Sequence, residues 1–359
     1  MQVRSRAGLF TKLLLVGSLV AVVAGCSGSK PSSSGSCTSS SQTSTSGQFD
    51  QVVAAAKSEG SVTLYTPTQQ TILDAWTSGF KSAYPTIKLS IFRASPGQLV
   101  AKLAADEQGK TPAADVLELN QDGPTSTLAT YDGQGKLATL AGPHFQDKDF
   151  QAAVESPNRA YVYATVFSWA WNTQLLPNGI HGWNDFLSSN LANGKVAVWD
   201  PAIASIVPTF YNSAIAASGD PKYLQGLAGQ KPGIYPGSEA MENAVASGEV
   251  AATMFGSKRV KTLAAKGAPV GFAVPPQGAG VGGLETGILK TAPHPNAAQV
   301  FANWLASEDG QKCVLSSGTP ARSNVPGNDI DFASLKPSVP VTSDQQKAFV
   351  AQFNALFQR

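Results

Sequence analysis

Residues 61–103 read SVTLYTPTQQTILDAWTSGFKSAYPTIKLSIFRASPGQLVAKL, and this stretch decides the fold class. Residues 61–65 form a short apolar run that predicts a buried strand, and the large apolar residues of 72–80 then recur at helical spacing. Residues 87–91 alternate as a second strand. The residues Ser95–Gln98 follow with the pattern of a capping box, with proline at the first helical position, and predict a second helix. Strand and helix in alternation predict an α/β fold with mainly parallel sheets flanked by helices.

The same alternation continues along the rest of the chain. Further strands are expected at residues 114–119, 162–171, 196–199, 250–255 and 284–289. Further helices are expected after Ser205, at residues 238–247, 300–305 and 307–315, and from a second capping box at Ser343–Gln346. Roughly 310 residues of body exceed what one core usually holds, so we expect two lobes.

The composition excludes several classes of protein. With 42% hydrophobic and 14% charged residues among 359, the chain can bury at least one full core, which excludes wholesale disorder. Removal of the three positive charges in residues 1–12 lowers the formal net charge from +2 to −1, and a near-neutral chain offers no broad field for nucleic acid. Three cysteines and three histidines, without CxxC or HExxH, predict no metal site, and we expect no cofactor.

The N-terminus predicts export and lipid anchoring. The apolar run Leu13–Ala24 follows the basic residues and has about half the length that spans a bilayer, which is typical of a signal peptide. The run ends Val23-Ala24-Gly25-Cys26, which resembles the lipobox of bacterial lipoproteins. This resemblance implies that Cys26 becomes the first mature residue, carries acyl chains and holds the protein on the membrane. The alternative is an ordinary secretory signal with an incidental cysteine.

Residues 26–47 are almost entirely Ser, Thr and Gly after the cysteine, and we expect a flexible tether because such a segment buries little apolar surface. Cys37 lies in this tether and Cys313 lies near the end of the chain. Outside the cytoplasm the two could form a disulfide. A buried Cys313 with a free Cys37 is the alternative.

Four stretches of the body resemble a known family: VTLYT at 62–66 after a Lys-Ser-Glu-Gly lead-in, AADVLELN at 113–120, GKVAVWDP at 194–201 and GILKTAPHPNAAQVFANWLASEDGQ at 287–311. In order and spacing they are similar to the extracellular solute-binding proteins of ABC importers, in the type II family that includes ferric-iron binders. The resemblance implies two α/β lobes joined by crossing strands. It also implies that a small-molecule solute is held in the cleft between the lobes and presented to a membrane permease.

We therefore expect a monomer that works outside the cytoplasm, divided as the resemblance implies. The expected parts are a signal peptide at 1–25, a tether at 26–47, a first lobe from 48–165 with 286–335, and a second lobe from 166–285 with 336–359.

The resemblance also places the iron ligands of the family on this chain. The family's histidine falls on Gln69, its glutamate on about Asn120, and its paired tyrosines near Gly256 and Ser257. Each hard anionic ligand is thus replaced by a neutral or small residue. We therefore expect no ferric binding through this set.

The cleft is expected to suit a small polar or anionic solute. Amide side chains can donate and accept hydrogen bonds, helix starts at Ser95 and Ser205 offer free N–H groups, and arginine matches oxyanions with two bonds at a time. Ordinary loop polarity and solvent-facing charge are the alternatives for these positions. The expected ligand-binding residues are Thr66, Gln69, Arg93, Ser95, Asn120, Ser205, Tyr235, Ser257 and Arg259.

The sequence thus predicts a lipid-anchored extracytoplasmic receptor of an ABC importer, for a phosphonate, phosphate ester or carboxylate, and not an enzyme. A ferric-type binder with altered ligands and an anchored hydrolase that uses Ser and His are the alternatives. The GxGxxG pattern of Gly278, Gly280 and Gly283 precedes a predicted strand rather than a helix, which argues against a dinucleotide site. His144, His181 and His294 are expected to be exposed loop residues.

Overall fold

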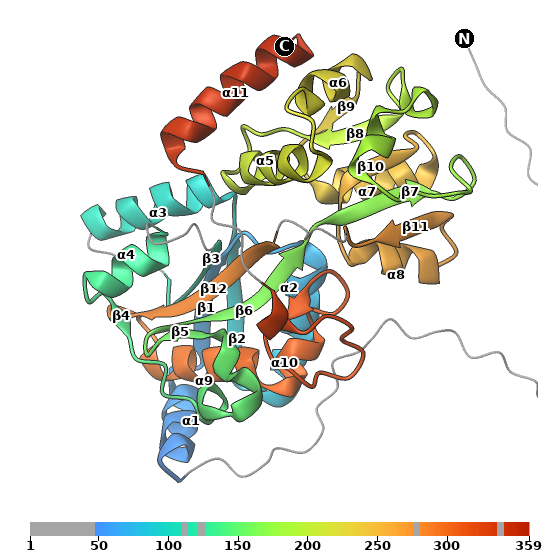
Figure 1. Ribbon diagram of the computed structural model, residues 1–359. Helices are drawn as coiled ribbons and strands as arrows, with labels where there is room; N and C mark the ends of the chain where they lie inside the picture. Colours follow the sequence, from blue (N-terminus) through green and yellow to red (C-terminus); the bar gives the residue numbers. More distant parts are fainter. Residues whose placement is uncertain (1–46, 110–113, 121–125, 276–280, 336–340, 359) are drawn as a thin grey trace, which may run out of the picture. The chain divides into compact units, whose positions relative to one another are not determined.

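The computed structural model describes residues 47–109, 114–120, 126–275, 281–335 and 341–358, which form two sheets covered by helices (Figure 1). In spatial order the first sheet contains β13 (Thr319–Pro320), β6 (Arg159–Val166), β12 (Val281–Leu289), β3 (Val116–Asn120), β1 (Ser61–Thr66) and β2 (Lys88–Arg93), with β4 (Leu137–Ala138) on β12 and β5 (Val154–Ser156) on β6. The second sheet contains β11 (Val270–Ala273), β7 (Ser168–Asn172), β10 (Ala252–Gly256), β8 (Val196–Trp199) and β9 (Gly233–Tyr235).

Each sheet has its own helices and its own core. The first sheet is accompanied by α1 (Gly47–Glu59), α2 (Gln70–Ala83), α3 (Pro96–Gly109), α4 (Thr127–Gly133), α9 (Pro295–Ala306) and α10 (Glu308–Lys312). The second is accompanied by α5 (Ile206–Ser218), α6 (Tyr223–Gly229), α7 (Ser238–Ser247), α8 (Arg259–Ala265) and α11 (Ser343–Phe357). Trp76, Phe80 and Phe301 are buried in the first core, and Trp169, Phe210 and Phe255 in the second. The predicted two-lobed α/β fold is confirmed.

Strands that are linked by helices pair in parallel, as the repeating pattern predicts. β1 is parallel to β2 and β3, and β8 is parallel to β9 and β10. The long strands β6 and β12 pair antiparallel with each other, and β7 pairs antiparallel with β10 and β11. Both sheets are therefore mixed, because the strands that connect them do not belong to strand-helix-strand units.

One strand passes from the first sheet into the second. The predicted strand at 162–171 is divided into β6 and β7, with Phe167 between them. The chain has returned to the first sheet by Val281, which pairs with Val166, ahead of the expected return at residue 286. Lys258, at the start of α8, adds a side-chain link: its buried Nζ lies 2.8 Å from Asn328 Oδ1 and 2.9 Å from an oxygen of Asp329.

The C-terminal helix α11 belongs to the second core. Phe349 and Phe353 are buried against Tyr211 of α5. The capping box of α11 lies one residue before the predicted one, because Thr342 has extended backbone angles and exchanges hydrogen bonds with Gln345. Cys313 lies in the first core and is disulfide-bonded. Its partner lies outside the described residues, as do Cys26 and Cys37, so the Cys37–Cys313 pairing stays a prediction.

Two carboxylates hold the start of α9 against the first sheet. Asp115 is fully buried and accepts hydrogen bonds from the backbone N–H groups of Thr63 and His294, each at 2.7 Å. The other carboxylate, Glu59 of α1, accepts from the backbone N–H groups of Asn296 and Ala297 at 3.1 and 2.7 Å. Acidic groups are favourable there because the N–H groups of a first helical turn have no partners within the helix.

The imidazole of His294 completes this contact. Its Nδ1 lies 3.0 Å from Asp115 Oδ2, and its Nε2 lies 3.0 Å from the hydroxyl of Ser61. The predicted exposed loop histidine is therefore half-buried and ties β1 to α9. The sequence pattern misses this role because the three residues meet only in the folded chain.

Replacing Asp115 with asparagine is expected to lower the free energy of unfolding by about 2–3 kcal/mol, because a buried acceptor of several hydrogen bonds loses its charge and one acceptor oxygen. Urea unfolding monitored by circular dichroism measures this. Asp74→Asn is the matched control, because Asp74 is exposed on α2, and it is expected to change stability by less than about 0.5 kcal/mol. Equal stability of the two variants would contradict the role given to Asp115.

Candidate functional site

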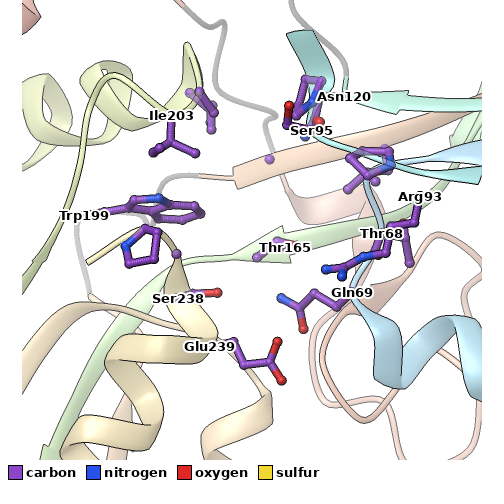
Figure 2. A pocket seen from close by; sticks show the side chains of 18 of the residues that line it. Thr68, Gln69, Arg93, Ser95, Asn120, Thr165, Trp199, Ile203, Ser238 and Glu239 are labelled. Atoms are coloured by element: carbon purple, nitrogen blue, oxygen red, sulfur yellow. The ribbon is translucent and has the colours of Figure 1, made fainter. Parts of the chain in front are cut away.

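A cavity of about 430 Å³ lies where strands of both sheets end (Figure 2). The first sheet contributes residues that follow the carboxyl ends of β1, β2 and β3, and the second contributes residues at the ends of β8 and β9. Thr165 and Phe167 of the connecting strand also line the cavity. In Figure 2, Gln69, Arg93, Ser95 and Asn120 face Trp199, Ile203, Ser238 and Glu239 across the cavity. In open α/β sheets, ligands bind at this edge.

Four of the predicted binding residues come together in this cavity. Gln69, Arg93, Ser95 and Asn120 all line it, and they come from segments that are separated in the sequence. They meet because parallel strands present their carboxyl ends at the same edge of a sheet.

The other five predicted residues do not line the cavity, and each of them has another environment. Thr66 is fully buried beneath it, where its hydroxyl contacts Glu118. Ser205 precedes α5 between two lining residues, Ala204 and Ile206. Tyr235 instead donates its hydroxyl proton to Glu249 at 2.8 Å.

The last two, Ser257 and Arg259, donate hydrogen bonds to Glu242, a buried acid of α7. Ser257 donates from its backbone N–H and its hydroxyl to Glu242, at 2.8 and 2.6 Å. Arg259 donates to the other Glu242 oxygen at 2.9 Å and to Asn243 at 2.7 Å. Its Nε also lies 3.9 Å from Glu239, which does line the cavity. Arg259 therefore stands behind Glu239 instead of facing the cavity.

The guanidinium of Arg93 is the basic group in the described lining of the cavity. Its Nε donates to the carbonyl oxygen of Thr68 at 2.7 Å, which fixes the head group beside the end of β1. Among the described residues no carboxylate forms an ion pair with it. Its remaining N–H donors are directed into the cavity (Figure 2). A planar fork of this kind matches a carboxylate or a phosphoryl group.

The start of α3 lies beside this guanidinium. Gln98 returns its side-chain oxygen to the backbone N–H of Ser95 at 3.1 Å, which is one half of the predicted capping box. The Ser95 hydroxyl also donates to that oxygen, at 2.9 Å, and so does not act as the accepting cap. The N–H groups of the first turn, after Pro96, therefore remain available for an anion at the cavity edge.

Two buried polar atoms of lining residues lack hydrogen-bond partners in the described part of the chain. They are Oε1 of Gln69 and Nε1 of Trp199. A buried polar atom without a partner is costly, so such atoms in a cavity mark positions where a ligand supplies the missing bond. Gln69 follows β1 of the first sheet, and Trp199 is the last residue of β8 in the second sheet.

Sequence reasoning missed several lining residues, above all Trp199, Thr68, Tyr163 and Glu239. Trp199 ends a strand that was predicted correctly, so the rule for strand ends could have found it. Thr68 lies one residue before Gln69. Tyr163 lies in the middle of β6, and Glu239 in the first turn of α7. Neither position carries a local signal that distinguishes a lining side chain from one in the core or on the surface.

A buried carboxylate lies beneath the cavity. Glu118 of β3 is fully buried, and both of its hydrogen bonds fall on Oε2: Thr66 and Thr68 donate to it, the latter at 2.7 Å. Its Oε1 has no partner among the described residues. Burial raises the pKa of Glu118 to about 7, against the smaller lowering effect of the two hydroxyls. The site thus contains an acid that titrates near neutral pH.

A family model described as bacterial extracellular solute-binding protein matches residues 75–336, which is most of the chain. The chain belongs to this family. Comparison with curated proteins gives no match.

Solved structures of periplasmic binding proteins share the fold. AfuA from Actinobacillus pleuropneumoniae, with fructose-6-phosphate bound, has a TM-score of 0.65 at 20% identity, over 83% of this chain and 99% of that one. A substrate-binding protein of an ABC transporter from Agrobacterium tumefaciens has a TM-score of 0.69 at 13% identity, over 85% and 97%. Iron-bound HitA from Pseudomonas aeruginosa has a TM-score of 0.59 at 21% identity, over 83% and 98%.

The protein is therefore an extracellular solute-binding protein, and its ligand is a small-molecule solute. The recognition of the type II periplasmic-binding-protein family from the sequence is confirmed. In the described segments no helix combines the length and the apolar composition needed to cross a membrane.

The raised pKa of Glu118 predicts a pH-dependent stability. The folded protein binds an extra proton between the ordinary pKa of 4.5 and about 7, so the stabilisation is complete below pH 4.5 and is lost as the pH rises to 7. Relative to Glu118→Gln, the wild type is expected to lose about 3 kcal/mol of unfolding free energy over this range. Urea unfolding at several pH values measures the difference.

Glu107→Gln is the control with the opposite sign, because the hydrogen bond from Lys136 lowers the pKa of Glu107. Its contribution is present above the ordinary pKa and is lost as the pH falls. A constant difference between wild type and Glu118→Gln from pH 4.5 to 7 would show that Glu118 has an ordinary pKa.

Proposed function

We propose that this receptor is anchored to the membrane by acylated Cys26 and captures a small anionic solute, of the phosphate ester, phosphonate or carboxylate type. The observation that carries the proposal is Arg93, whose guanidinium faces the cavity without a carboxylate partner among the described residues. Arg93 is solvent-exposed, so its N–H donors are accessible to a ligand that supplies the counter-charge.

The neighbours of Arg93 support an oxyanion. The start of α3 offers N–H groups, and Asn120 offers an amide within the same lining. The cavity volume of about 430 Å³ lies in the range of small-molecule sites. AfuA, which shares the fold, is described with a sugar phosphate bound, and its ligand is of the proposed chemical class.

The far wall of the cavity supports an organic body on the solute. Trp199 offers a ring face and an unpartnered N–H, and Ile203 offers apolar surface although its side chain is 46% exposed. A solute that reaches from Arg93 to Trp199 touches both sheets. Such a ligand favours a closed arrangement of the lobes, because only that arrangement lets it make both sets of contacts.

Replacement of Arg93 by alanine is expected to weaken an anionic solute by about 1.5–3 kcal/mol, which is the contribution of a charged hydrogen bond. The solute is first selected by thermal shift among sulfate, phosphate esters, phosphonates, carboxylates, polyamines, thiamine and ferric citrate, and its affinity is then measured by calorimetry. Lys347→Ala, at an exposed position of α11, makes the same change in net charge and is expected to bind normally. Equal binding by both variants would remove Arg93 from the site.

Ferric citrate tests the main alternative. The described lining contains one carboxylate, Glu239, and one tyrosine, Tyr163, and lacks the adjacent tyrosine pair of the iron binders. Tight binding of Fe³⁺ alone, with the colour of an iron–tyrosinate bond, would favour the ferric alternative over an organic anion.

Cys26→Ser is expected to move the protein from the membrane fraction to the aqueous fraction. The variant lacks the residue that carries the acyl chains, and stable membrane attachment needs two or more such chains. Detergent phase partitioning of cells that express each form measures this. Cys37→Ser is the matched control and is expected to remain with the membrane. Retention of Cys26→Ser in the membrane fraction would contradict the lipid anchor.

One observation favours a second candidate, a hydrolase. The Ser61 hydroxyl lies 3.0 Å from Nε2 of His294, and Nδ1 of His294 lies 3.0 Å from Oδ2 of Asp115. This row of three side chains resembles the nucleophile, base and acid of a catalytic triad. The row lies at the amino ends of β1 and β3, however, and Asp115 is also occupied by two backbone N–H groups. We propose a structural role for the row, and consumption of the selected solute by wild type but not by Ser61→Ala would overturn it.

A further inference from the structure

The strongest feature outside the cavity lining is the buried chain of hydroxyls that joins Glu118 to two lining residues. Thr68 Oγ1 lies 2.7 Å from Glu118 Oε2 and 2.9 Å from the hydroxyl oxygen of Tyr163. Thr68 and Tyr163 both line the cavity and are 2% and 3% exposed. The protonation state of Glu118 therefore bears directly on two groups that a solute touches.

From this arrangement we infer that Glu118 is a positioning residue that sets the hydrogen-bond polarity of Thr68 and Tyr163, so that an anionic solute binds together with a proton. The inference rests on the proposed function, because it concerns an anion in the same cavity. It adds a residue outside the lining and a pH dependence that the contacts of the lining alone do not predict.

When Glu118 is ionised, the direction of the chain is fixed. A carboxylate accepts only, so Thr68 must donate its single hydroxyl proton to Glu118. Thr68 then accepts from Tyr163, and the Tyr163 proton is used within the protein. The Tyr163 oxygen has only lone pairs left for the cavity, and the negative charge of Glu118 lies directly below. Both effects disfavour an anion.

When Glu118 is neutral, the chain can reverse. The acid proton on Oε2 is donated to Thr68, Thr68 donates to the Tyr163 oxygen, and the Tyr163 hydroxyl proton becomes free for a solute. The buried charge is also removed. Burial raises the pKa of Tyr163 well above its ordinary value, so Tyr163 keeps its proton throughout. An anion in the cavity therefore favours the protonated form of Glu118, and protonation favours the anion.

The surroundings of Glu118 leave it without a counter-charge. Thr66 at the end of β1 and Thr68 just after it contribute hydroxyls, and β6 contributes Tyr163. On β12, Thr286 lies opposite Glu118 and donates its hydroxyl to the carbonyl oxygen of Leu117. Arg93, the cation in the described lining, acts electrostatically on Tyr163 and donates to the backbone carbonyl oxygen of Thr68. In the described residues Glu118 forms no ion pair, and a buried carboxylate of this kind takes up a proton readily.

Sulfate is the probe for the test, because its charge stays constant between pH 5 and 9 whereas phosphate esters titrate in that range. Wild-type protein is expected to bind sulfate about fivefold more tightly at pH 6 than at pH 8, which corresponds to a rise of about one unit in the pKa of Glu118 on binding, from about 7 in the free protein. Calorimetry at pH 7.5 in buffers of different ionisation enthalpy is expected to show proton uptake. Glu118→Gln, which is neutral at every pH, is expected to bind at pH 8 as the wild type binds at pH 6.

Two variants separate this role from a structural one. Tyr163→Phe lacks the released hydroxyl and is expected to lose sulfate affinity mainly at pH 6, while it keeps part of the pH dependence through the charge of Glu118. Glu107→Gln, on α3 and outside the lining of this cavity, is expected to keep the full pH dependence of the wild type. A pH profile that is the same in wild type and Glu118→Gln would overturn the inference.

An infrared titration of the wild type, labelled with ¹³C at the glutamate carboxyl groups, keeps the test independent of whether the variants fold. A protonated carboxyl band that disappears near pH 7 without sulfate, and at higher pH with it, is expected. Absence of that band at pH 6 would overturn the inference even if anions bind. Failure of every anionic probe to bind at any pH would count against the proposed solute class, and the titration without solute would then decide the state of Glu118.

Discussion

The rest of the structure depends on the contact that Glu59 and Asp115 make with the start of α9. These two carboxylates bind the backbone N–H groups at residues 294, 296 and 297, and they join α1, β3 and the last part of the first lobe at one edge of the sheet. The helix end needs acceptors and the acids need donors, so each offsets the cost of burying the other. Because this edge is held by hydrogen bonds between carboxylates and backbone N–H groups, the opposite edge of the same strands does not have to stabilise the fold.

At the opposite edge of the sheet, which lines the cavity, the polar groups are not fully hydrogen-bonded. Its polar groups are partly unpaired: the guanidinium of Arg93 lacks a carboxylate among the described residues, and Gln69 and Trp199 each have a buried polar atom without a partner. The two buried atoms, on Gln69 and Trp199, reduce the stability of the empty protein unless a ligand completes their hydrogen bonds. The connecting strand places the two sets of groups on two sheets, so a solute that contacts both sets has to bridge the sheets. We propose that such a solute couples binding to lobe closure.

The sequence predicts those features of the fold and the cavity that depend on the local pattern of apolar and polar residues. Strand ends could be found from apolar runs, and Gln69, Arg93, Ser95 and Asn120 lie in the cavity because they directly follow predicted strands. Ser257 and Arg259 also follow a strand and Tyr235 ends one, but their partners Glu249 and Glu242 come from or near α7, and such a tertiary pairing leaves no trace in local pattern. Trp199 and Tyr163 resemble core aromatics in a strand. Glu118 is hidden for a similar reason: a single acid within an apolar strand usually faces solvent, and here it faces inward.

The most direct measurement for the central claim, that one anionic solute bridges both sheets in this cavity, is a crystal structure with the tightest-binding anion from a solute screen. We expect an oxyanion within hydrogen-bond distance of the Arg93 guanidinium and the first turn of α3, with the body of the solute against Trp199. Solute density elsewhere on the protein, or in the cavity but in contact with one sheet alone, would contradict it.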